Sequence, residues 1–128
     1  MIAAVQTVDG VLLVDVEDGS VAPGSELPDA DRPQVELPRV VATSGSGATV
    51  VAVVDRRPPL AISNDAGATW REAGGGLPAG FAVAVAEDDP DRMLFAARNR
   101  LYVSTDGGTF WRSLDVELPD VVAAAWLD

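Results

Sequence analysis

The fold of this 128-residue chain is decided by two similar stretches, ISNDAGATW at residues 62–70 and VSTDGGTFW at residues 103–111. They share a serine, an aspartate, a glycine and a tryptophan, and each shared residue recurs 41 residues later. The dipeptide Leu-Pro at 77–78 recurs at 118–119 with the same offset, and a third copy lies 40 residues earlier, at 37–38. A short apolar run follows each Leu-Pro. The chain is therefore built from repeats of about 40 residues.

Short strands are expected within each repeat. Valine and alanine dominate, glycine and proline interrupt them about every 8 to 12 residues, and no amphipathic helical stripe is present. A period of about 40 residues with such strands is typical of β-propeller blades, which have four strands each. The chain is thus expected to be all-β, with four-stranded antiparallel blades. We expect strands at 39–43, 49–54, 59–63 and 69–73 in blade 2, and at 81–86, 93–97, 100–104 and 110–114 in blade 3.

The first repeat lacks one strand, and the C-terminus carries a spare one. Residues 2–5 and 11–16 resemble the second and third strands of a blade. The Pro- and Asp-rich stretch 20–38 replaces the fourth strand, with about eight residues more than the matching part of blade 2. The innermost strand is missing, but 121–127 supplies an extra copy of it. The single domain, 1–128, would then hold blade 1 at about 1–37, blade 2 at about 38–77 and blade 3 at about 78–118.

The two stretches follow the pattern Ser-x-Asp-x-Gly-x-Thr-Trp and resemble the Asp-box, or bacterial neuraminidase repeat, of sialidases and sortilin-type receptors. The second copy has Phe110 where the pattern has threonine. The resemblance implies a β-propeller but no particular activity, because one fold hosts many functions. We expect structural roles: the Asp accepts hydrogen bonds from turn N–H groups, the Gly adopts a positive φ, and the Trp is buried between sheets. The residues are Ser63, Asp65, Gly67, Thr69, Trp70, Ser104, Asp106, Gly108 and Trp111.

The composition argues against several classes of function. All nine basic residues are Arg, and 20 Asp and Glu give a net charge of −11, which argues against nucleic acid or an anionic membrane as a partner. There is no Cys, no His and no calcium-loop spacing, so we expect neither a metal nor a cofactor. The N-terminus lacks the basic segment of a signal peptide, and no apolar run is long enough to span a bilayer. These features predict a cytoplasmic protein.

Enzyme activity is not expected. The likeness to sialidases implies an arginine cluster, a tyrosine nucleophile backed by Glu, and an Asp as the acid. This chain has one tyrosine, Tyr102, in the third strand of blade 3, and its innermost runs carry no carboxylate. Only Asp9 and Asp120, in loops of one face, are loose candidates for a carboxylate pair. The main hypothesis is a non-enzymatic binding or scaffold module. The alternatives are a degenerate sialidase- or glycosidase-like enzyme and a fragment of a longer Asp-box protein.

Arginines gather in one set of loops. In a propeller, the loops that lead into each innermost strand share a face with the loops between the second and third strands. Arginine suits bidentate recognition of carboxylate or phosphate. We expect this face to bind an anionic small molecule, a glycan or an acidic protein patch, with plain solvation of charged loops as the alternative. Its arginines are Arg39, Arg56, Arg57, Arg98 and Arg100.

Three blades do not close a ring, because propellers use roughly four to eight. An open arc is expected to leave the strands 2–5 and 121–127 unpaired at opposite ends, and apolar edges of this kind invite pairing. The strand 121–127 of one chain would complete blade 1 of a second chain, which predicts a C2 homodimer with a six-bladed ring. The intermolecular seam would involve Ile2, Val5, Val121, Val122 and Trp126.

Overall fold

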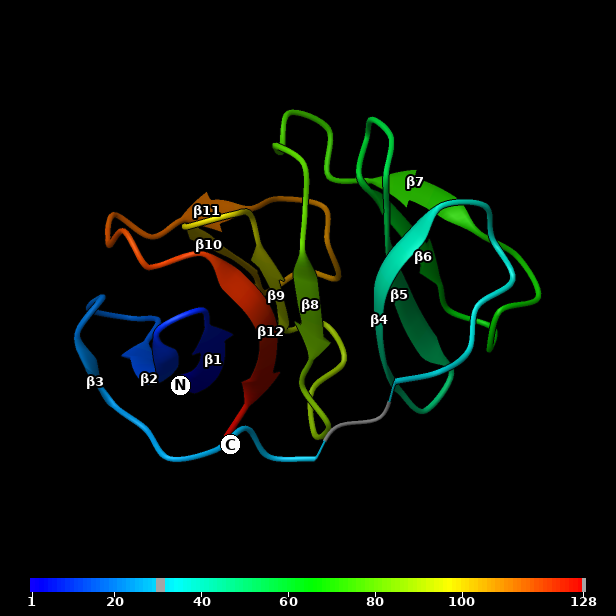
Figure 1. Cartoon of the computed structure of the whole chain (residues 1–128). Coiled ribbons are helices and arrows are strands. Elements are labelled where there is room, and N and C mark those ends of the chain that lie inside the picture. Colours follow the sequence, from blue (N-terminus) through cyan, green and yellow to red (C-terminus); the bar gives the residue numbers. More distant parts are fainter. Residues whose placement is uncertain (30–31, 128) are drawn as a thin grey trace.

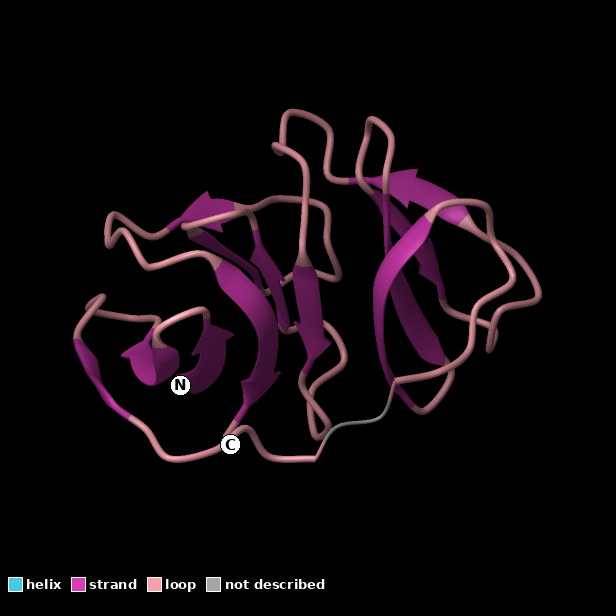
Figure 2. Cartoon of the chain, in the orientation of Figure 1, coloured by secondary structure: helices cyan, strands magenta, loops and turns pink. Residues whose placement is uncertain are grey.

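The chain folds into three four-stranded antiparallel sheets, as expected for an all-β chain of three blades. The computed structural model describes residues 1–29 and 32–127, and this part contains strands and turns but no helix (Figure 2). It therefore holds no helix long and apolar enough to cross a membrane. The strands are β1 (Ile2–Thr7), β2 (Gly10–Asp15), β3 (Val21–Pro23), β4 (Val40–Ser46), β5 (Thr49–Val54), β6 (Leu60–Ser63), β7 (Arg71–Ala73), β8 (Ala82–Val85), β9 (Met93–Ala96), β10 (Leu101–Ser104), β11 (Arg112–Ser113) and β12 (Val121–Trp126).

Each sheet is one blade. Blade 2 is β4 to β7 and blade 3 is β8 to β11, each in chain order, whereas blade 1 has the order β12, β1, β2, β3. The innermost strand β8 packs against both β4 and β12, so blade 3 lies between the other two (Figure 1). All eight strands expected in blades 2 and 3 are present. The spatial order is therefore blade 2, blade 3, blade 1.

The closing strand of blade 1 comes from the same chain, which corrects the expectation of a strand supplied by a partner. β12 runs antiparallel to β1, with Ala3 opposite Trp126 and Val5 opposite Ala124. Blade 1 follows blade 3 in space, so β1 and β12 do not lie at opposite ends of the arc. A strand in the same chain also outcompetes a free copy, because tethering gives it a high effective concentration. The residues assigned to an intermolecular seam, Ile2, Val5, Val121, Val122 and Trp126, all belong to this intramolecular strand pair.

The stretch after β2 also differs from the expectation. A short fourth strand, β3, is present in blade 1, and it pairs with β2. The long connection from β3 to β4 leads from blade 1 to blade 2 and must therefore pass blade 3. The extra residues found in the sequence are needed for this crossover.

Part of the crossover covers blade 2. Along residues 32–38 exposed and half-buried side chains alternate, with Pro33, Val35 and Leu37 half-buried. The Thr43 hydroxyl donates to the Pro33 carbonyl at 2.7 Å. Thr43 lies on the side of blade 2 that faces away from blade 3, because its neighbour Ser44 faces blade 3 and strand residues alternate. The crossover thus covers part of a sheet face on which no further blade of this chain packs.

Blade 3 is covered on both faces, which explains its continuous apolar runs. Ala84, Leu94 and Val103 pack toward blade 1 in one buried cluster. Val85 and Phe95 pack toward blade 2 in another. A strand buried on both faces has no polar face to alternate with. The two apolar cores of the molecule are therefore the two interfaces between blades.

Candidate functional site: an arginine-lined hollow

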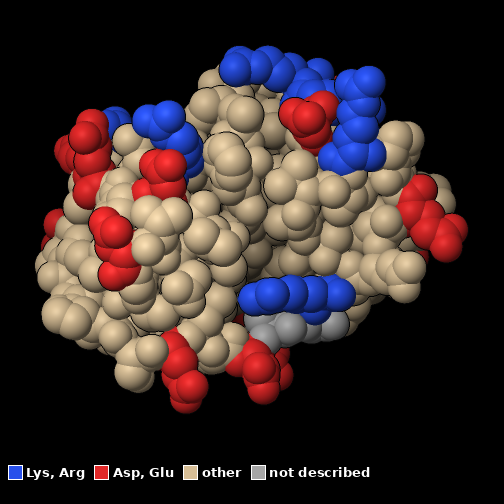
Figure 3. All heavy atoms as spheres, viewed as in Figure 1, with Lys and Arg blue, Asp and Glu red and all other residues tan. Residues whose placement is uncertain are grey.

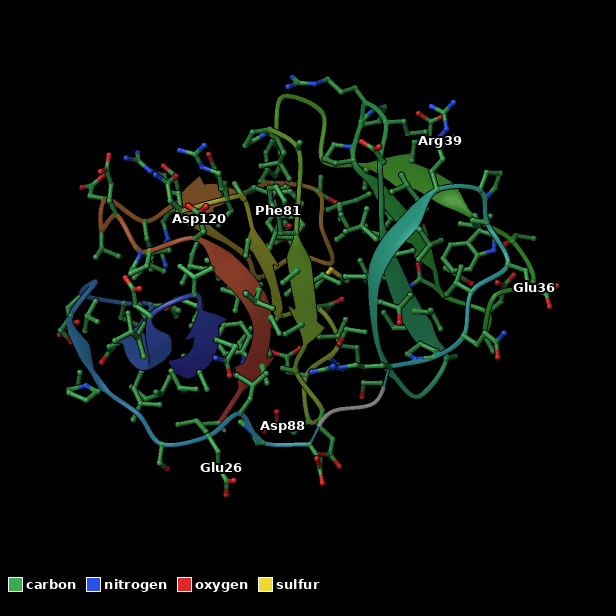
Figure 4. All side chains as sticks on the ribbon, viewed as in Figure 1. Glu26, Glu36, Arg39, Phe81, Asp88 and Asp120 are labelled. Carbon is green, nitrogen blue, oxygen red and sulfur yellow. The ribbon has the colours of Figure 1, made fainter. Side chains whose placement is uncertain are left out.

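The loops expected to carry arginines lie together along one edge of the arc. Figure 4 labels Arg39, Phe81 and Asp120 at this edge, and Asp88 at the opposite one. Figure 3 shows basic side chains gathered there, with acidic side chains among them. We call it the upper edge, after its place in Figure 1.

A hollow of about 560 Å³ opens on the upper edge, where loops of blades 2 and 3 meet. Three of the five expected arginines line it together with two aromatic rings, and its size falls in the range of small-molecule sites. Its lining residues are Arg57, Pro78, Ala79, Phe81, Ala97, Arg98, Asn99, Arg100 and Tyr102.

The three arginines of the hollow differ in their ion pairs. Arg98 Nε lies 3.5 Å from an Asp120 carboxylate oxygen, and Arg100 Nη2 lies 3.3 Å from one of Glu117. These pairs are exposed, and pairs of that kind are worth only about 0–1 kcal/mol. Arg57 makes no ion pair with any residue that the structure describes. A ligand anion could therefore bind the Arg57 guanidinium directly. It could also bind those of Arg98 and Arg100, because breaking their weak ion pairs costs little free energy.

Backbone hydrogen bonds hold the turn that carries Arg98 and Arg100. The Val121 N–H donates to the Arg98 carbonyl at 2.7 Å, and the Leu118 N–H donates to the Asn99 carbonyl at 2.9 Å. The Ala97 N–H closes the turn on the Arg100 carbonyl at 2.9 Å. The turn is thus fastened to the segment leading into β12, which orders the backbone beneath two of the guanidinium groups.

Arg39 and Arg56 do not line the hollow. Arg39 has a φ of 62°, an uncommon conformation for a residue with a Cβ, and its carbonyl accepts from the Asp55 N–H at 2.9 Å. Arg56 is exposed and follows Asp55 in the same loop. Of the five arginines expected at this face, the structure brings three to one hollow.

No sequence pattern linked Tyr102 or Phe81 to the arginines, whereas the structure brings them to the same hollow. Tyr102 lies on β10 and packs edge-on against Phe95 with ring centroids 5.9 Å apart. Phe81 is 42% exposed, a high value for an aromatic residue next to a strand. Neither carried a sequence signal, because the hollow forms only where two blades meet.

Asp9 and Asp120, the candidates for a carboxylate pair, take part in hydrogen bonds of the loops beside blade 1. The Val8 N–H donates to the Asp120 carbonyl at 2.9 Å, and the Asp9 N–H donates to the Thr7 hydroxyl at 3.1 Å. The Asp120 carboxylate is engaged by Arg98. Within residues 1–29 and 32–127, no cluster of three or more acidic side chains is arranged to hold a metal ion.

The two turns that follow the pattern Ser-x-Asp-x-Gly lie away from the hollow and have matching geometry. In the first, the Asp65 carboxylate accepts from the Thr69 hydroxyl at 2.6 Å, from the Thr69 N–H at 2.8 Å and from the Ser63 hydroxyl at 2.8 Å. These bonds, with those from Thr69 the strongest, lower the pKa of Asp65 from 3.8 to about 2. Gly67 has a φ of 90°. This carboxylate organises the turn between β6 and β7.

The second turn repeats this arrangement in blade 3. The Asp106 carboxylate accepts from the Phe110 N–H at 3.0 Å and from the Ser104 hydroxyl at 2.8 Å, which lowers its pKa. Gly108 has a φ of 91°, and a Cβ there would lie 2.6 Å from Ile62 Cδ1 of blade 2. Glycine is thus needed both for the turn and for the approach of two blades.

Comparison with known proteins supports the fold and leaves the activity open. No protein-family model matches the sequence, and no curated protein matches it. The structure is similar to the crystal structure of a GH74 enzyme of Niastella koreensis, over 94% of this chain, with a TM-score of 0.50 and 25% sequence identity. GH74 is a glycoside hydrolase family with a β-propeller fold. The similar region is 18% of that chain, so the likeness concerns a few blades of a much longer protein.

Proposed function

We propose that the chain is a non-enzymatic binding module whose arginine-lined hollow takes an anionic ligand or an acidic patch of a partner protein. The observation that carries the proposal is the convergence of Arg57, Arg98 and Arg100 on one hollow, with Arg57 unpaired among the described residues. Guanidinium groups bind carboxylate and phosphate oxygens in a bidentate way, which gives both geometry and energy.

The net charge of −11 sets a condition on this function. An acidic molecule repels anions at long range, so binding must rely on short-range contacts and not on electrostatic steering. We therefore expect a modest association rate that rises with salt, since salt screens the long-range repulsion. A protein that used a uniformly basic surface would show the opposite salt dependence.

The test is calorimetric titration with inorganic phosphate and with an acidic peptide of glutamates. Replacing Arg57, Arg98 and Arg100 by Gln should abolish binding of both probes while leaving the unfolding midpoint unchanged, because the three are surface residues. Replacing Arg32, Arg39 and Arg56 by Gln removes three positive charges from exposed residues outside the hollow and is the control for net charge. A probe that binds the triple variant as well as it binds the wild type contradicts the proposal.

One observation favours a second candidate, a degenerate glycosidase-like enzyme. The structural neighbour is a glycoside hydrolase, and Tyr102 lines the same hollow as the three arginines. Turnover of generic sialoside and glucoside substrates tests this candidate. Activity that disappears in Tyr102→Phe would support an enzyme, whereas an inactive wild type that binds phosphate supports the binding module.

Self-association is a separate prediction. The strand edges no longer provide a reason for it, because β1 and β12 pair within the chain. The surfaces available to a second copy are the outward faces of blades 1 and 2, and two arcs packed end to end would form a ring of six blades. Sedimentation of the intact chain should then give twice its 13.3 kDa. A single species of 13.3 kDa at micromolar concentration contradicts the dimer.

A further inference from the structure

The concave side of the arc carries a second hollow, of about 340 Å³, formed by the innermost strands. β4, β8 and β12 contribute to it, and Figure 3 looks onto this side. Three of its residues are large apolar side chains with high exposure: Val41 at 48%, Phe81 at 42% and Val122 at 57%. The hollow thus exposes three large apolar side chains to water.

The three exposed residues occupy the same position in the three repeats. Each is the fourth residue after the leucine of a Leu-Pro, so every blade presents one apolar side chain at the same level of the inner wall. Their chain neighbours in the apolar runs, Ala82 and Val121, are buried between blades. A single exposed apolar residue is ordinary, whereas a cluster lining a concave surface marks a binding site.

One positively charged side chain lines the same hollow as these three residues. Arg32, in the crossover, lines the same hollow, is exposed and makes no ion pair with a described residue. The hollow therefore carries three exposed apolar side chains and one positive charge. That combination complements an acid with an apolar body.

We infer that the concave hollow binds a small amphipathic monoanion, such as a carboxylate with an unbranched or aromatic apolar body. The apolar body would lie across Val41, Phe81 and Val122, and the acidic head would meet the Arg32 guanidinium. This site is distinct from the arginine-lined hollow, although Phe81 borders both. It does not depend on the function proposed above.

Calorimetric titration with octanoate, hexanoate and octanol tests both parts of the inference, the apolar contact and the contact of the acidic head with Arg32. Octanoate should bind about fifteenfold more tightly than hexanoate, because each buried methylene contributes about 0.8 kcal/mol. Octanol should bind about tenfold more weakly than octanoate, since it lacks the charge that Arg32 would meet.

Substitutions test which residues of the concave hollow bind octanoate. Arg32→Gln should weaken octanoate about tenfold and leave octanol unchanged, and Val122→Asp should abolish binding of both. Val8→Asp changes another exposed valine, in the β1–β2 turn, and should have no effect. Arg57→Gln should also leave octanoate unchanged, which separates this site from the arginine-lined hollow. Absence of octanoate binding, equal binding of octanol, or full binding by Val122→Asp would each overturn the inference.

Discussion

At the scale of single residues, the turns of the pattern Ser-x-Asp-x-Gly show how side-chain hydrogen bonds replace those of a strand. The Ser63 hydroxyl accepts from the Gly67 N–H at 2.8 Å and donates to the Asp65 carboxylate. Together they satisfy the N–H groups of a turn that leads from β6 to β7 and that no strand could pair. Ala66 in this turn has a φ of 58°, a left-handed conformation that is unfavourable for a residue with a Cβ.

Replacing Ala66 by glycine should therefore stabilise the protein. The equivalent position in blade 3 is Gly107, with a φ of 74°. Removing the Cβ relieves a left-handed conformation, and we expect a gain of about 0.5–1 kcal/mol in the free energy of unfolding, measured with urea. Ala68→Gly, in the same turn but without a positive φ, should lose stability. A loss in both variants would show that Ala66 is not strained.

The lowered pKa of Asp65 predicts a pH dependence. Its folded value of about 2 lies below the ordinary 3.8, so its contribution to stability is complete above about pH 4 and disappears as the pH falls toward 2. In Asp65→Asn the unfolding temperature should fall less steeply across this window than in the wild type. Adding Asp106→Asn should flatten the curve further. An unchanged slope in both variants contradicts this account.

At the scale of elements, blade 3 contacts its two neighbouring blades through adjacent residues. Trp111 packs toward blade 2, edge-on against Phe95 with ring centroids 6.1 Å apart. The next residue, Arg112, donates from Nη2 to the Val16 carbonyl of blade 1 at 3.0 Å. One repeat earlier, Arg71 donates to the Gly107 carbonyl of blade 3 at 2.9 Å. An arginine that donates to a carbonyl of the next blade, directly after a tryptophan, thus recurs with the period of the repeat.

This alternation predicts unequal costs for the two tryptophans. Trp111→Ala should lower the free energy of unfolding by about 3 kcal/mol, because it empties an interface between two blades. Trp70 precedes Arg71 and so lies on the other face of blade 2, where no further blade of this chain packs. Trp70→Ala should cost about half as much, as judged by urea midpoints at constant slope. Equal losses would mean that the crossover covers Trp70 as well as a blade would.

At the scale of the whole molecule, the two chain ends complete one blade. The Leu127 N–H donates to the Ile2 carbonyl at 3.0 Å, so the ends of β12 and β1 lie side by side. Blade 1 is therefore built from both ends of the chain: β12 is its first, innermost strand and β1 is its second. The β3–β4 crossover makes this possible, because it carries the chain from the last blade of the arc back to the first.

A circular permutant tests this closure. Joining residue 127 to residue 2 through a short linker, with new ends at 115 and 116, keeps every strand in place. We expect a folded protein with a similar urea midpoint, since neighbouring termini tolerate such rearrangement. Far-ultraviolet circular dichroism and sedimentation give the readout. A permutant that is unfolded, or that folds only as a dimer, would restore the intermolecular seam.

The sequence by itself determined the local and periodic features. Strand positions in blades 2 and 3 followed from apolar runs between turn residues, as for β5, because such signals act over a few residues. The loops that carry Arg57, Arg98 and Arg100 followed from the repeat in the same way. Tertiary structure alone decided that blade 3 lies between blades 1 and 2. It therefore also decided that β12 pairs with β1 of its own chain. It also decided that Tyr102 and Phe81 join the arginines and that Val41, Phe81 and Val122 share one hollow. These are contacts between residues far apart in the chain. A regular spacing relates some of them, but only the packing of the sheets in space decides which side chains meet.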